Sequence, residues 1–176
     1  PERDGGGADV ACDAGGPRPL PTTEDVSCPA PAAPDRPTAP CPSPTAFDPG
    51  RLEGDRTLSA GCWRIDRRVE VAGAATLTVE PGAVLVFGGD GALDFVDEAR
   101  LEAVGTEADP IVFEGVAELA GAWGGVRFAQ STAPAGGNRL EHVIVRDGGG
   151  FDWNTSAARE ANVAVQEAVQ VTLRDV

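Results

Sequence analysis

The sequence predicts an all-β fold built from a short strand-and-turn unit that recurs along the chain. Residues 77–87 (LTVEPGAVLVF) and 101–113 (LEAVGTEADPIVF) each contain two short runs of alternating apolar residues around a turn, and 123–128 (WGGVRF) adds another run that ends in Phe. Alternation is the period of a strand and not of a helix. The first two units start 24 residues apart and end 26 apart. A period in the twenties is typical of a solenoid, in which each turn of chain stacks on the previous one.

Two details support this prediction. Glu80-Pro81-Gly82 fits a type II turn, because Pro presets φ at the second position and Gly accepts the positive φ of the third. Val163 to Leu173 repeats the spacing of residues 77–87, displaced by 86 residues. We therefore expect residues 161–176 to form a further turn of the solenoid, with strands that pair with the preceding one.

The motifs LTVEPGAVLVF, RLEAVGTEADPIVFEG, GAWGGVRF and NRLEHVIVRDGGG, in this order, resemble the right-handed parallel β-helix repeat proteins of bacterial cell envelopes. The resemblance covers residues 77–176 and implies the pectate-lyase-like fold, a right-handed parallel β-helix of a few coils. It implies no single activity, because one fold hosts many chemistries. Sugar-cleaving members of this fold use carboxylates, often with calcium, and an Arg or Lys base.

The chain divides into two parts by composition. Residues 1–50 hold 12 of the 15 prolines and few large apolar residues, which predicts a disordered or disulfide-stapled spacer. Residues 51–176 form the predicted β-helix domain, with 51–71 as its N-terminal cap because terminal repeats are atypical. The strand pattern is still running at Val176, so we expect a truncated C-terminal end whose open edge favours end-to-end self-association.

The four cysteines, Cys12, Cys28, Cys41 and Cys62, predict one or two disulfides in an oxidising compartment, with three pairings open. A zinc site is the weaker alternative, because the chain has no C-x-x-C motif and a single His.

A net charge of −14 disfavours nucleic acid as a partner. The chain has no apolar run of about 18 residues, so no membrane span is predicted. Any signal peptide or lipid-attachment segment would precede Pro1, and we expect an extracellular or cell-surface location in a bacterial envelope.

Outward positions of the predicted strands carry the residues that an enzyme of this fold would use. Two carboxylates at a fixed separation can act as general acid and base. The catalytic candidates are Glu102, Glu114, Arg127, Glu141, Arg146 and Asp147. The alternative role for Arg127 and Arg146 is a ladder of surface ion pairs. His142 shares the parity of Leu140, which places it in the core or at a corner, and no nucleophile motif accompanies it.

Acidic residues crowd the segment after Gly88, and clustered carboxylates are what calcium requires. The candidate metal ligands are Asp90, Asp94, Asp97 and Glu98. The sequence GGDGAL approaches a calcium-binding nonapeptide, but Leu93 stands at the ligand position. The alternative is an acidic loop that is simply solvated. Calcium is thus the one candidate cofactor, and no other cofactor is expected.

Aromatic residues offer a stacking surface for sugar rings. Trp153 and Phe151 lie in an insertion and are the candidate ligand-binding residues, whereas Trp123, flanked by glycines, is expected to pack in the core or at a corner.

These sequence features are consistent with two functions. The first is a non-catalytic exported or surface-tethered module that contacts a polysaccharide or a surface protein. The alternative is a polysaccharide lyase or glycoside hydrolase.

Overall fold

The computed structural model describes residues 41–129, 137–150, 161–166 and 170–176, and these residues form strands and no helix. The all-β prediction is therefore confirmed for the described part of the chain. Every pair of neighbouring strands runs parallel. The strands are β1 (Thr45–Ala46), β2 (Arg51–Leu52), β3 (Arg56–Leu58), β4 (Gly61–Val71), β5 (Thr76–Val79), β6 (Ala83–Phe95), β7 (Arg100–Val104), β8 (Ile111–Gly115), β9 (Val126–Phe128), β10 (Asn138–Glu141), β11 (Val143–Val145), β12 (Val163–Val165) and β13 (Val171–Arg174).

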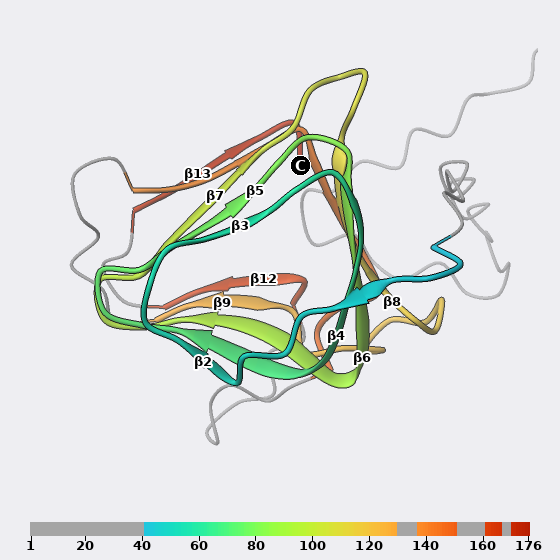
Figure 1. The fold of residues 1–176 in the computed structure, drawn as a ribbon, viewed down its shortest axis with the longest axis horizontal. Coiled ribbons are helices and arrows are strands. Elements are labelled where there is room, and N and C mark those ends of the chain that lie inside the picture. The colour runs from blue at the N-terminus through green and yellow to red at the C-terminus, as the bar shows by residue number, and fades with distance from the viewer. Residues whose placement is uncertain (1–40, 130–136, 151–160, 167–169) are drawn as a thin grey trace, which may run out of the picture. The chain divides into compact units, whose positions relative to one another are not determined.

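The chain passes alternately between two parallel sheets. The smaller sheet, here sheet B, has the order β13-β10-β7-β5-β3, and the larger one, sheet A, has the order β1-β4-β6-β8-β11, with β2 beside β4, β9 beside β6 and β12 beside β9. Neighbours in sheet B are successive visits of the chain to that sheet. Each circuit through both sheets therefore lies against the circuit before it, and the strands outline three sides in Figure 1.

Sheet A supplies two of these sides because β4 and β6 bend at the same corner. Ile65 lies opposite Phe87 and Arg68 opposite Ala92, so β6 carries two extra residues there. Close approach of the backbone requires glycine at position 91 of this corner, and position 88 lies against the Asp66 side chain. A Cβ on Gly88 would lie 2.5 Å from Asp66 Oδ1, and one on Gly91 would lie 2.4 Å from the Ile65 carbonyl oxygen. We call the strands before the corner the first half of sheet A and those after it the second half.

The predicted turn is confirmed, and the first two units align at their starts but not at their ends. The Ala83 amide donates to the Glu80 carbonyl over 3.2 Å, and Gly82 has φ +77°, as a type II turn requires. Leu77 lies opposite Leu101, as expected. The phenylalanines that end the two units do not align, since Phe113 lies opposite Leu85 and Phe87 opposite Gly115. A slip of two residues keeps each side chain on the same face, so alternation alone could not detect it.

The strands predicted within residues 161–176 are present and pair with those of the preceding circuit, as expected, but their correspondence to residues 77–87 is wrong. β12 pairs with β9 in sheet A, and β13 pairs with β10 in sheet B. Val163 therefore belongs to sheet A, whereas Leu77, its expected counterpart, belongs to sheet B. Both sheets show the same alternation, so spacing does not reveal to which sheet a strand belongs.

The core is a set of columns in which inward side chains stack from one circuit to the next. Phe87 and Trp123 stack with ring centroids 3.9 Å apart, and Phe95 stacks on Phe128 at 5.2 Å. Asn138 occupies a core column and is 1% exposed. Its Oδ1 accepts a hydrogen bond of 2.8 Å from the Leu101 amide, which satisfies both buried groups.

The first circuit is held by a covalent link. Cys41 and Cys62 form a disulfide, and β1 pairs with β4 a few residues further along. Phe47 is 5% exposed and packs edge-on against Trp63 with ring centroids 6.4 Å apart. The expectation of at least one disulfide is thus confirmed, while Cys12 and Cys28 lie outside the described residues. Most of the predicted spacer, residues 1–50, also lies outside them.

Candidate functional site

Charged side chains on the outside of the second half of sheet A form one connected network. Arg51, Glu70, Asp94 and Arg127 lie opposite one another on successive strands. Arg127 donates two hydrogen bonds to the Asp94 carboxylate, from Nε to Oδ1 over 2.6 Å and from Nη2 to Oδ2 over 2.7 Å. Arg68 also pairs with Asp94, and Arg51 pairs with Glu70. Although it points outward, Asp94 is fully buried beneath these arginines.

A separate ion pair lies on the first half of sheet A. Arg146 follows β11 and donates from Nε to Glu114 Oε2 over 3.1 Å. The side chains of Arg146 and Glu114 are 20% and 15% exposed. Both Arg127 and Arg146 therefore form ion pairs, as the alternative interpretation expected, but Arg127 pairs with the buried Asp94 and Arg146 forms a separate pair with Glu114.

The outer face of sheet B carries a third group, two carboxylates joined by one arginine. Arg139 Nη2 donates to Glu141 Oε1 over 2.8 Å, and its Nη1 lies 3.4 Å from Glu102 Oε1. The hydrogen bond from Arg139 lowers the pKa of Glu141 and raises the pKa of Arg139.

The six candidate catalytic residues are thus distributed over different faces. Glu102 and Glu141 share the face of sheet B, Glu114 and Arg146 share the first half of sheet A, and Arg127 lies on the second half. Asp147 occupies a corner with φ +64°, where its carbonyl accepts a hydrogen bond from the Ala122 amide. His142 also occupies a corner, with φ +48°, as predicted, and its Nδ1 lies 3.7 Å from Asp175 Oδ2.

The four predicted calcium ligands do not form a cluster. Asp94 is engaged by arginines, and Asp97 sits in a turn with φ +57°, 3.9 Å from Arg51. Across the described residues, no three His, Cys, Asp or Glu side chains are arranged to hold a metal ion.

The aromatic candidates divide into one that the structure describes and two that it does not. Trp123 is fully buried, and its Nε1 donates to the Arg146 carbonyl over 2.8 Å, so core packing is confirmed. Trp153 and Phe151 lie outside the described residues.

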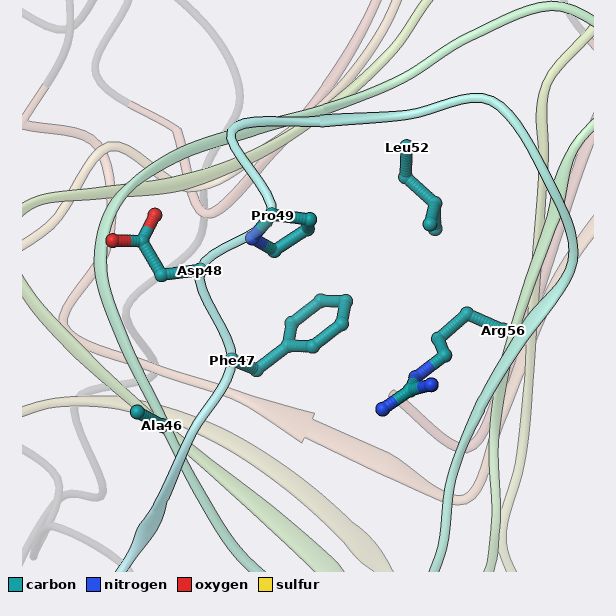
Figure 2. Close-up of a pocket in the computed structure, with 6 residues that line it drawn as sticks. All are labelled: Ala46, Phe47, Asp48, Pro49, Leu52 and Arg56. Atoms are coloured by element: carbon teal, nitrogen blue, oxygen red, sulfur yellow. The ribbon is translucent and has the colours of Figure 1, made fainter.

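A pocket that sequence reasoning missed lies beside the first circuit. This N-terminal pocket has a volume of about 290 Å³ and is lined by Ala46, Phe47, Asp48, Pro49, Leu52 and Arg56. Figure 2 shows the Arg56 side chain reaching toward the Phe47 ring, while the Asp48 carboxylate points away from that ring. No motif marks these residues, because four of them come from the Pro-rich stretch that carried no strand pattern.

Comparison with protein-family models, curated proteins and solved structures finds no match to this chain. The two parallel sheets are compatible with the β-helix-like fold implied by the resemblance of residues 77–176. The Cys41–Cys62 disulfide is compatible with an oxidising, extracellular environment. Within the described ranges no helix is long and apolar enough to cross a membrane.

Proposed function

We propose that this chain is a non-catalytic, exported or surface-tethered module, a right-handed parallel β-helix whose outer faces contact a polysaccharide or a surface protein. One observation carries the proposal: the predicted catalytic residues are divided among separate faces, with Glu114 paired to Arg146 on one face and Glu102 and Glu141 joined by Arg139 on another. A hydrolytic or eliminating site needs an acid and a base that converge on one substrate bond. Glu114 and Glu102 lie on different sides of the stack, each beside its own arginine.

Rigidity supports a contact role. The ion pairs run across strands, from one circuit to the next, and so fix outward side chains at the regular spacing of a parallel sheet, about 4.8 Å. A surface with preset side-chain positions loses little conformational entropy when a partner binds. Export is supported by the Cys41–Cys62 disulfide.

The test is a binding survey with the full chain. Immobilised polysaccharides from bacterial envelopes and plant walls, together with intact bacterial cells, should deplete the protein from solution in a saturable manner. Arg139→Gln and Arg127→Gln variants locate the contact face, since only the variant on that face should bind more weakly. Absence of depletion by every glycan and by cells would contradict the proposal.

A second candidate function rests on the sheet B group. Glu102, Arg139 and Glu141 place two carboxylates and a guanidinium within one network, the set expected of a polysaccharide lyase or hydrolase. Incubation of the protein with uronic-acid polymers and calcium, followed in the ultraviolet for unsaturated products, tests this function. Product formation that disappears in Glu141→Gln would replace the contact role with an enzymatic one.

A further inference from the structure

We propose that the N-terminal pocket binds a small organic carboxylate with an apolar body, and that Arg56 holds the carboxylate. This inference goes beyond the proposed contact function and does not depend on it. It rests on the placement of one arginine, the fixed apolar wall opposite it, and the size of the space between them.

Arg56 lies at the end of a column of sheet B residues whose other side chains point into the core. It lies opposite Leu77, which lies opposite Leu101, and both leucines are fully buried. No described strand lies on the far side of β3 in sheet B, so the guanidinium is exposed and extends into the pocket (Figure 2). Among the described residues no carboxylate lies within ion-pair distance of Arg56. A charged donor group at the end of an apolar column is therefore available to an external anion.

The other charged residue of the pocket does not compete for this arginine. The Asp48 carboxylate accepts from Arg67 Nε over 2.6 Å and points away from the Phe47 ring (Figure 2). The guanidinium of Arg56 is consequently the charge presented to the pocket interior. Its fork of donors matches the two oxygens of a carboxylate.

The wall opposite Arg56 is apolar and held in place. Phe47 packs edge-on against Trp63, and its amide donates to the Arg64 carbonyl over 2.8 Å. Leu52, at the end of β2, and Pro49 complete the apolar surface. A volume of about 290 Å³ is at the lower end of small-molecule sites, which fits one ring and a short acid chain.

The experiment titrates the full chain with 3-phenylpropionate as probe and follows backbone amide shifts by NMR. We expect saturable shifts that centre on Phe47, Leu52 and Arg56. The uncharged analogue 3-phenylpropanol should bind about tenfold more weakly, because it lacks the charge-assisted hydrogen bonds.

Variants separate the pocket from general surface charge. Arg56→Gln should weaken probe binding about tenfold, whereas Arg56→Lys should retain most of it. Arg64→Gln is the matched control, since Arg64 pairs with Asp66 and does not line the pocket; it should leave binding unchanged. Circular dichroism verifies that each variant is folded. Absence of saturable shifts, shifts centred elsewhere, equal binding of the alcohol, or unchanged binding by Arg56→Gln would each overturn the proposal.

Discussion

Along one inward column of sheet B, Val79, Ala103 and Leu140 are at most 1% exposed, whereas the next residue, Leu173, is 52% exposed. Leu140 and Leu173 are the same residue type in the same column. They differ in that Leu140 has a strand on each side, and Leu173 has a described neighbour on one side only. In this architecture an apolar residue is buried by the circuits that flank it, so its contribution to stability depends on its place in the stack.

The largest expected effect comes from a core residue in the middle of the stack. Phe87→Ala removes a ring that stacks on Trp123 and should lower the free energy of unfolding by about 4 kcal/mol. Leu173→Ala, in the half-exposed position, should lower it by less than about 1 kcal/mol. Urea titrations of both variants measure the difference. Equal losses would show that position in the stack does not govern burial energy.

The first circuit differs from the last described one because the Cys41–Cys62 disulfide links it covalently to β4. Replacing Cys41 and Cys62 by Ser frees a loop with a sequence separation of 21, which should lower the free energy of unfolding by about 3 kcal/mol. Hydrogen exchange should then show β1 and β4 exchanging about as fast as β13. Wild-type protein treated with a reductant is the control and should behave in the same way. If β4 stays protected in the Ser variant, its pairing with β6 is sufficient to hold the edge.

The third prediction compares a buried charge with an exposed one. Asp94→Asn weakens the interactions with Arg127 and Arg68 and should lower the free energy of unfolding by about 2 kcal/mol. Asp66→Asn, whose side chain is 59% exposed beside Arg64, should lower it by less than about 0.5 kcal/mol. Thermal unfolding at low and high salt measures both. A similar small loss from the two substitutions would show that the arginine cover of Asp94 adds no stability.

The smallest expected effect is a pH dependence on sheet B. Because Arg139 lowers the folded-state pKa of Glu141 below its ordinary 4.5, ionised Glu141 stabilises the fold above that value. This stabilisation is lost as the pH falls through the lowered pKa. Stability curves of wild type and Glu141→Gln should therefore differ at pH 7 and converge in acid, as urea titrations at each pH can show. A pH-independent offset between Glu141→Gln and wild type would contradict the prediction.

Local chemistry made parts of the fold predictable. Glu80-Pro81-Gly82 specified its turn through backbone preferences, and the alternation around Leu77 and Leu101 gave their pairing. The strand β4 was harder to find. Residues 51–71 were interpreted as an atypical cap, but β4 spans Gly61–Val71, and its corner at Asp66 and Arg67 interrupts the alternation that would have revealed it.

The candidate sites were less predictable because they depend on register. Asp94 was interpreted as a calcium ligand or solvated acid on its local sequence. Its burial follows from lying opposite Arg127, 33 residues later, and from the reach of Arg68 across the strand pair. The N-terminal pocket likewise requires Phe47 to pack on Trp63. No local pattern in one sequence encodes such long-range pairings.

The circuits of sheet B are unequal in length, although their columns stay aligned. Leu77 lies opposite Leu101, 24 residues later, Glu102 opposite Arg139, 37 later, and Asn138 opposite Val171, 33 later. Extra residues thus enter between strands without moving the strands themselves. The fold requires apolar side chains in its inward columns but sets no fixed number of residues at its corners. Insertions at the corners can therefore diversify the outer surface while the interior remains unchanged. Divergence of that kind erases a fixed repeat from the sequence well before it alters the stacking of the chain.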